Sequence, residues 1–364
     1  MKDASILADN PQPRDSRWFA GSSLRVGLTY DLRDHYLSLG YSEEQTAEFD
    51  SRETIDALAE ALAELGHVPD LIGNVDELIR RLVAGERWDL VFNIAEGMFG
   101  LGREALIPAL LDNYEIPYTF SDPCVMALCL QKNFAKAVLR EAGLPTANYV
   151  LVRESAELGK VNLTYPLFAK PVAEGTSKGI DGASRISDFA GLKRRCDELL
   201  DRYRQPVLVE EYLPGREFTV GILGTGGSAE VLGTLEILIR EQGEQGAYSY
   251  LNKEKCEQLV DYRIAKDAVA RRAEELALQA WCVLGCRDAG RLDLRLDANG
   301  QPALIEVNPL AGMHPTHSDL PMIATAVGMS YRKLVERILL SASRRLAGAL
   351  AENSPAGPPT RQAV

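Results

Sequence analysis

The strongest constraint on the fold comes from two short segments near the C-terminal end of the chain. Residues 290–296 read GRLDLRL, residues 302–308 read PALIEVN, and an Asp-Ala-Asn-Gly sequence at 297–300 lies between them. Successive side chains of a strand point to opposite faces of a sheet, and Asn-Gly is typical of tight turns. The pattern therefore predicts an antiparallel hairpin with one apolar and one polar face.

The polar face of this hairpin is a candidate metal site. It would carry Asp293, Glu306 and Asn308 side by side, with Arg291 next to them. Mg²⁺ binds proteins through one or two carboxylates and completes its shell with water and substrate phosphates. The group therefore suits a Mg-nucleotide site, and the alternative is an amphipathic hairpin whose polar face meets water.

The composition is that of an ordinary globular protein and excludes several classes of function. The 364 residues are enough for two or three domains, and 46% are hydrophobic and 25% charged. The net charge of -12 argues against binding to nucleic acid or to an anionic membrane surface. Six cysteines without a C-x-x-C pair, no apolar run of about 20 residues and no signal peptide indicate a cytoplasmic protein with reduced thiols.

The first 120 residues alternate between strand-like and helix-like segments. Strands are expected at 24–30, 67–72 and 88–94, and helices at 51–65, at 75–84 and up to Tyr114. This order predicts a parallel sheet covered by helices. Ligands of such sheets bind beyond the carboxyl ends of the strands, which places the loop at 30–50 with Glu96, Arg103 and Glu104 at the functional edge. A solvated charged rim is the alternative.

The middle of the chain offers lysines and a glycine-rich loop. A helix is expected at 124–142 with Lys132 on an apolar face, and a strand ending at Lys170 precedes the loop Ala-Glu-Gly-Thr-Ser-Lys-Gly at 173–179. The N–H groups and hydroxyls of such a loop can surround phosphate oxygens, although no Walker A motif is present and a plain surface turn is the alternative.

The next strand has features of a nucleotide site. Residues 207–217 (VLVEEYLPGRE) join an apolar strand to acidic residues and a Pro-Gly turn. Backbone groups at Glu211 and Leu213 are candidates to contact an adenine edge, and Glu217 is a candidate to accept from ribose hydroxyls. Lys253 is a third isolated lysine, and a helix at 265–284 leads to the hairpin.

In their order along the chain, these motifs resemble the ATP-grasp superfamily and, within it, the D-alanine–D-alanine ligase family. The resemblance covers residues 121–340 well and the first 120 residues in outline. It implies an α/β and α+β protein in which a Rossmann-like parallel α/β domain precedes an ATP-grasp fold. The expected organisation is an arm at 1–23, an N-terminal substrate domain at 24–121, a central subdomain at 122–208, a catalytic domain at 209–344 and a tail at 345–364.

The resemblance also implies roles for individual residues. ATP would lie between two antiparallel sheets, with one or two Mg²⁺ (or Mn²⁺) ions on Asp293, Glu306 and Asn308. The implied ATP-binding residues are Lys132, Lys170, Ser177, Glu210, Glu211, Leu213, Glu217 and Lys253. The implied catalytic residues are Arg291 and the N–H of Gly312, which face a developing oxyanion, and Thr176 in the phosphate loop. The implied amino-acid-binding residues are Glu48, Glu96, Ser318 and Asp319.

Departures from the family pattern gather around the amino-acid substrates. The first strand lacks the family's Gly-Gly-x-Ser-x-Glu loop, so its substrate-binding glutamate has only Glu48 or Asp50 as a counterpart. Glu96-Gly…Gly102-Arg-Glu replaces a His-Gly…Gly-Glu-Asp-Gly segment, Glu254 replaces a tyrosine, and Thr176 replaces a serine.

The family's Ser-Leu pair near the end reads Ser318-Asp319 and follows His314 and His317. These changes point to a cationic or amine-bearing second substrate, or alternatively to local hydrogen bonding within the loop. No third ligand accompanies the two histidines, so a metal site is not expected there.

These observations predict an ATP-dependent carboxylate–amine ligase of the D-alanine–D-alanine ligase type, which forms a peptide bond through an acyl phosphate. Its partners would be amino acids and, from the resemblance, a second copy of the chain bound through the N-terminal domain. A dipeptide or amide ligase of secondary metabolism and a non-catalytic ATP-binding regulator are the alternatives. Arg291 argues against the regulator, because ATP binding alone needs no oxyanion donor.

Overall fold

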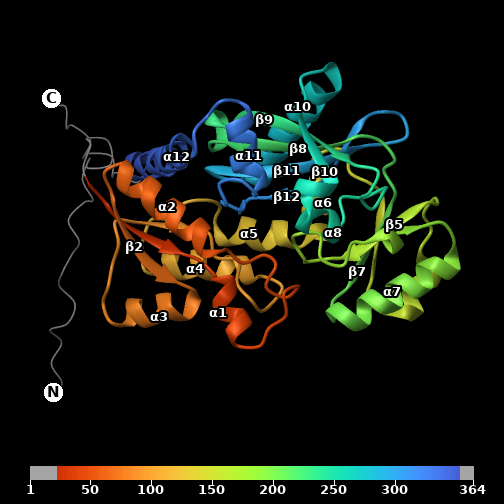
Figure 1. Ribbon diagram of the computed structural model, residues 1–364, viewed down its shortest axis with the longest axis horizontal. Helices are drawn as coiled ribbons and strands as arrows, with labels where there is room; N and C mark the ends of the chain where they lie inside the picture. Colours follow the sequence, from red (N-terminus) through yellow and green to blue (C-terminus); the bar gives the residue numbers. More distant parts are fainter. Residues whose placement is uncertain (1–22, 353–364) are drawn as a thin grey trace, which may run out of the picture.

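The computed structural model describes residues 23–352, with side chains through Arg345. Three sheets form the framework, and they follow one another along the long axis of the molecule (Figure 1). Among the described residues, no helix has the length and apolar character needed to cross a membrane. Most of the predicted arm and the end of the predicted tail lie outside the described residues. Residues 345–352 of that tail continue a helix, and the predicted domain boundaries stay predictions.

The N-terminal unit is the predicted parallel α/β sheet, in the strand order β2-β1-β3. Side chains of β3 and of β1 after Arg25 are buried, because helices cover both faces of a parallel sheet. The predicted loop at 30–50 also contains a short helix, α1, which the polar sequence did not indicate. The elements are β1 (Arg25–Thr29), α1 (Arg33–Ser38), α2 (Arg52–Glu64), β2 (Val68–Gly73), α3 (Val75–Val83), β3 (Leu90–Asn93), η2 (Arg103–Ala105) and α4 (Leu106–Asn113).

Two helices connect this unit to the rest of the chain, where one helix was predicted at 124–142. Asp122 caps α5 (Pro123–Leu130) by accepting from the N–H groups of Cys124 and Val125. The chain leaves helical geometry at Gln131, with ψ of 88°, and α6 (Lys132–Glu141) begins at the next residue. The break places Lys132 at a helix start, with Lys136 one turn further on the same helix.

The central unit is an antiparallel four-stranded sheet in the order β4-β7-β5-β6, packed against one long helix. Apolar side chains of β5, β7 and α7 form its core, while Lys170 and Glu210 are buried polar residues of the same strands. The elements are β4 (Tyr149–Val152), η3 (Ser155–Lys160), β5 (Leu167–Pro171), η4 (Gly182–Ser184), β6 (Arg185–Ile186), α7 (Phe189–Tyr203) and β7 (Val207–Glu211).

The C-terminal unit is an antiparallel five-stranded sheet in the order β10-β9-β8-β11-β12, and it contains the predicted hairpin. Asp293 lies opposite Glu306, and Arg291 lies opposite Asn308. The other face of the hairpin packs on α10 around the fully buried Trp281. The elements are β8 (Glu217–Leu223), η5 (Gly226–Ser228), β9 (Glu230–Ile239), α8 (Tyr250–Glu254), α9 (Cys256–Leu259), β10 (Val260–Ile264), α10 (Ala268–Leu284), β11 (Ala289–Leu296), β12 (Pro302–Asn308), α11 (Asp319–Ala326) and α12 (Tyr331–Glu352).

The N-terminal and C-terminal units share one hydrophobic core. Side chains of β1 and α2 pack in the same cluster as those of α11 and α12, and α12 lies beside α2 (Figure 1). The buried Asp288 adds polar contacts across this junction, because it accepts from the N–H of Phe120 and from the guanidinium of Arg345. The loops at the end of the parallel sheet are therefore held against the polar face of the hairpin.

Candidate active site

Two cavities meet at the polar face of the hairpin. The smaller, of about 100 Å³, lies between the four-stranded and five-stranded sheets. The larger, of about 620 Å³, lies between the N-terminal unit and the C-terminal unit. Five residues line both cavities: Thr176, Lys253, Arg291, Glu306 and Asp319. A group transferred from a ligand of one cavity to a ligand of the other would pass these residues.

The smaller cavity is lined by most of the residues that were predicted to bind ATP. Its apolar part is formed by Phe168, Ile180, Leu213, Ile237, Ala247 and Ile305. The predicted Lys170, Ser177, Glu210, Glu211 and Glu217 also line it. The N–H of Glu211 donates to the carbonyl of Asn148 at 2.9 Å, so a backbone contact of Glu211 with an adenine edge would involve its carbonyl, and that contact stays a prediction. The N–H of Leu213 has no hydrogen-bond partner among the described residues.

Glu210 holds two lysines at the floor of this cavity. Its carboxylate lies 2.6 Å from Nζ of Lys136 and 3.0 Å from Nζ of Lys170. Burial alone would raise the pKa of Glu210, but the two ammonium groups lower it to about 2. Lys132, in contrast, lines neither cavity: its Nζ lies 3.1 Å from Glu306 and donates to the carbonyl of Glu174. Its contact with phosphates therefore stays a prediction, and Lys136 is a cavity residue that sequence reasoning missed.

The predicted phosphate loop lies between the two cavities and is strained. Thr176 and Ser177 both have positive φ, of 48° and 54°, a conformation that non-glycine residues rarely adopt. The hydroxyl of Ser177 donates to the carbonyl of Tyr248 at 2.9 Å, which fixes the loop against the C-terminal unit. Strain of this kind persists only where surrounding contacts enforce it, and it is frequent at ligand clamps.

Glu48 provides a second support for the loop. Its carboxylate accepts from the N–H of Gly175 at 2.5 Å and from Arg103 at 2.8 Å, and Lys178 lies 3.4 Å away. A Cβ on Gly175 would lie 2.5 Å from the same carboxylate, so only glycine allows the close approach. Glu48 lines the larger cavity as predicted, but its oxygens are occupied by the loop and by Arg103.

The hairpin places its polar side chains as the alternation predicted. Nδ2 of Asn308 donates to Asp293 at 3.1 Å, and Glu306 lies opposite Asp293 in the register. Burial raises the pKa of Asp293. Burial alone would also raise that of Glu306, but Lys132 and other nearby cations lower it.

The donor set of the hairpin fits a partial shell for Mg²⁺. No group of three or more His, Cys, Asp or Glu residues suited to a metal occurs among the described residues. Two carboxylates and an amide oxygen are nevertheless the type of set that Mg²⁺ uses when substrate phosphates supply further ligands.

Arg291 lies at the junction of the cavities, surrounded by acids. Its Nε is 3.1 Å from Asp319 and 3.6 Å from Asp293, and its side chain is 13% exposed. Burial opposes its charge, but the surrounding carboxylates raise its pKa, so it stays a cation. Nζ of Lys253 is 3.9 Å from the same Asp319.

The loop before α11 is compact at Gly312. A Cβ on Gly312 would lie 2.7 Å from Oγ of Ser318, which accepts from the N–H of His314 at 2.9 Å. Nε2 of His314 lies 3.6 Å from Glu53, and that of His317 lies 3.7 Å from Glu257. These four residues and Gly312 line the larger cavity.

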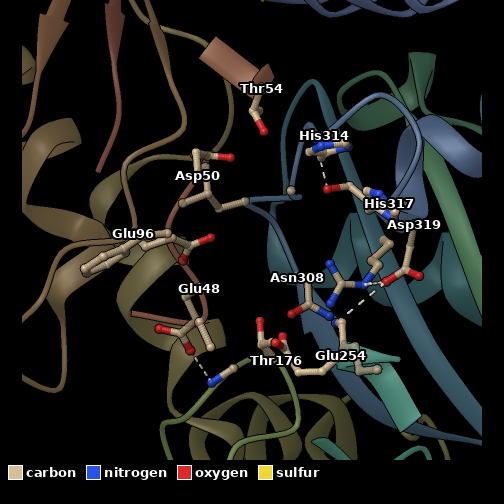
Figure 2. A pocket seen from close by; sticks show the side chains of 18 of the residues that line it. Glu48, Asp50, Thr54, Glu96, Thr176, Glu254, Asn308, His314, His317 and Asp319 are labelled. Atoms are coloured by element: carbon tan, nitrogen blue, oxygen red, sulfur yellow. Dashed lines mark hydrogen bonds and ion pairs between the residues drawn. The ribbon is translucent and has the colours of Figure 1, made fainter. Parts of the chain in front are cut away.

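Figure 2 shows the two walls of the larger cavity. Glu48, Asp50 and Glu96 come from the N-terminal unit and face Asn308 and Asp319 of the C-terminal unit across the cavity. The predicted Glu48, Glu96, Ser318 and Asp319 therefore surround one space.

Comparisons with known proteins agree with this architecture. A family model described as the D-ala D-ala ligase C-terminus matches residues 138–340. A D-alanine–D-alanine ligase of Bordetella avium is 36% identical over 264 residues, which are 71% of this chain and 80% of the relative. The chain belongs to the D-alanine–D-alanine ligase family. It is an ATP-dependent ligase of that family, and the family implies amino-acid substrates.

Other members and structures resemble the chain over most of its length. An uncharacterized protein, y4sG, of Sinorhizobium fredii is 32% identical over 309 residues, which are 80% of this chain and 88% of that protein. The crystal structure of a D-alanine–D-alanine ligase from Bacillus anthracis matches with a TM-score of 0.69 at 20% identity, over 91% of this chain and all of that one. The VanG D-Ala:D-Ser ligase of Enterococcus faecalis matches with a TM-score of 0.67 at 20% identity, over 88% of this chain and all of that one. The predicted combination of a parallel N-terminal sheet with an ATP-grasp fold is thereby confirmed.

Proposed function

We propose that the chain joins two amino acids through a peptide bond, using ATP to activate the carboxylate of the first as an acyl phosphate. The observation that carries the proposal is the position of Arg291 where the two cavities meet. One cavity has the lining of a nucleotide site, and the other has room and polar groups for amino acids. A ligase of this type needs a carboxylate, a γ-phosphate and an amine to meet at one place.

In the first step, an oxygen of the carboxylate attacks the γ-phosphorus, and ADP leaves. This reaction needs alignment and neutralisation of charge more than covalent help from the protein. Lys170 and Lys253 line the smaller cavity and supply positive charge, and Thr176 and Ser177 of the strained loop line the same cavity. Asp293, Glu306 and Asn308 would hold Mg²⁺, which would neutralise phosphate charge when bound.

In the second step, the free amine of the other amino acid attacks the acyl carbon, and phosphate leaves. The tetrahedral intermediate carries an oxyanion, which Arg291 and the N–H of Gly312 would stabilise. Arginine suits this role because it keeps its proton while it binds first a carboxylate and then the developing charge. Ser318 lies beside Gly312 and would bind the carboxylate of the second amino acid.

Glu48 has a different role in this proposal from the one predicted for it. Because its carboxylate already accepts from Gly175 and Arg103, it would position the phosphate loop rather than bind a substrate ammonium. Glu96 and Asp319 remain candidates for substrate contact. A homodimer formed through the N-terminal unit is also part of the proposal, and light scattering on the purified protein would test it.

Measurement of ADP release across a panel of D- and L-amino acids, singly and in pairs, tests the function. We expect release only when suitable amino acids are present, with a dipeptide as product. Tight ATP binding with no amino-acid-dependent release would contradict the proposal and favour a regulatory ATP-binding role.

A further inference from the structure

The N-terminal wall of the larger cavity carries carboxylates that have no partner. Asp50, Glu96 and Glu104 all line this cavity, and none of their carboxylates has an ion pair or a hydrogen bond among the described residues. Glu48, on the same wall, contrasts with them because two cations and an N–H group hold it. Asp50 and Glu96 point toward the cavity in Figure 2.

The other acids of the cavity have partners in the protein. Glu53 and Glu257 lie beside histidines, Glu254 lies 4.0 Å from Arg33, and Asp319 lies beside Arg291. Glu174 is paired with Lys178, and Glu306 with Lys132. Asp50, Glu96 and Glu104 are therefore the acids of this cavity that lack a partner among the described residues.

The surroundings of these three carboxylates raise the pKa of each of them. Burial and then the neighbouring Glu104 and Glu48 raise the pKa of Glu96 well above its usual value. Burial raises the pKa of Glu104 to about 7, and burial with Asp31 raises that of Asp50. Buried carboxylates are normally paired or hydrogen-bonded, so a group of three without partners is suited to a ligand that brings positive charge.

One amino-acid ammonium group does not account for three carboxylates in a cavity of about 620 Å³. The α-carboxylate of the same ligand would need Arg291 or Lys253, on the opposite side of the cavity. We propose that one of the two amino acids is basic, with a side-chain amine or guanidinium bound by Asp50, Glu96 and Glu104. This inference deepens the proposed ligase function and rests on it.

The test compares amino acids that differ mainly in side-chain charge. ADP release is measured with lysine and norleucine, ornithine and norvaline, and arginine and citrulline, as D and L forms, alone and with alanine as the other substrate. A charge-assisted contact predicts that kcat/KM for the basic member exceeds that of its neutral counterpart by about 10- to 150-fold. The same ratio is expected for the Kd measured calorimetrically with a non-hydrolysable ATP analogue.

The variants Glu96→Gln and Glu104→Gln test whether the preference for a basic amino acid depends on the carboxylates of the N-terminal wall. Both substitutions keep the shape of the side chain and should bring the basic-to-neutral ratio toward one, mainly through the basic substrate. Glu60→Gln on the exposed surface of α2 is the matched control and should leave the ratio unchanged. Binding measurements give the ratio even for a variant that has lost turnover, and thermal melting shows that it is folded.

The outcomes separate the two proposals. If neutral amino acids support ADP release as well as basic ones, the inference is overturned and the ligase function stands. If no amino acid of any kind stimulates ADP release, the proposed function fails, and the inference fails with it. A preference for basic substrates that survives both wall substitutions would also overturn the assignment of these carboxylates.

Discussion

Replacement of Arg291 by methionine separates chemistry from nucleotide binding. Methionine keeps much of the length of the side chain and removes its charge. Loss of a donor to an oxyanion typically lowers kcat by about 100- to 1000-fold, or about 2.7–4 kcal/mol. Because the nucleotide cavity keeps Lys136, Lys170 and Lys253, the Kd for ATP should change by less than about tenfold, or about 1.4 kcal/mol.

The same substitution has a predictable cost in stability. Arg291 lies 3.1 Å from Asp319 and 3.6 Å from Asp293, and each attraction is worth about 5 kcal/mol at an effective dielectric constant of about 20. Desolvation offsets much of this, and removal of one partner of a buried pair typically destabilises a protein by about 3–5 kcal/mol. In the double variant Arg291→Met/Asp319→Asn, part of the lost stability should return, since one uncompensated carboxylate is gone.

Single-turnover ADP formation, ATP titration and thermal melting of the two variants test this reasoning. The double variant should regain part of the lost stability while its turnover stays low. If turnover recovered together with stability, Arg291 would be a structural residue only. A loss of ATP affinity of about 100-fold or more would mean that Arg291 binds the nucleotide.

Three further predictions concern the surrounding network. Lys136→Met should lower the free energy of unfolding by about 3 kcal/mol and raise the KM for ATP, because Glu210 loses one of its two cations. The pKa of Glu210 is lowered from 4.5 to about 2, so the stability that its carboxylate contributes is complete above pH 4.5 and is lost as the pH falls toward 2. Acid titration of unfolding should show that this contribution is smaller in the variant. Glu104→Gln should instead raise the free energy of unfolding at high pH. The pKa of Glu104 is raised from 4.5 to about 7, so the ligand-free wild type loses stability as the pH rises through this interval. Denaturant unfolding at pH 8 should therefore show the variant to be more stable by up to about 3 kcal/mol. Glu48→Gln should speed proteolysis within residues 173–179 several-fold without ATP, because an amide holds Arg103 and Lys178 less strongly than a carboxylate does. Equal cleavage rates of the variant and the wild type would contradict the role of Glu48 as a support of the loop.

The sequence was most informative where local patterns determine the structure. Alternation around the Asp-Ala-Asn-Gly turn predicted the hairpin, and the register now pairs Asp293 with Glu306. The β/α alternation of the first 120 residues predicted the parallel sheet, in which β1 pairs with β2 and with β3. In both cases the side-chain pattern of a few consecutive residues decides the result.

Contacts between distant segments were much less accessible. The contact of Glu48 with Gly175 joins residues 127 positions apart, and no local pattern records it. Lys136 follows Lys132 by one helical turn, which was a signal, but neither the break at Gln131 nor the position of Lys136 at the smaller cavity was visible in the apolar sequence. Glu104 was placed at the functional edge, yet its lack of a partner depends on the packing of two units.

The most direct test of the account is ADP release by the purified protein in the presence of Mg²⁺, with matched basic and neutral amino acids of both chiralities. We expect release that depends on the amino acid, a dipeptide product identified by mass spectrometry, and a basic substrate preferred by about tenfold or more. ATP binding without any amino-acid-dependent ADP release would contradict it.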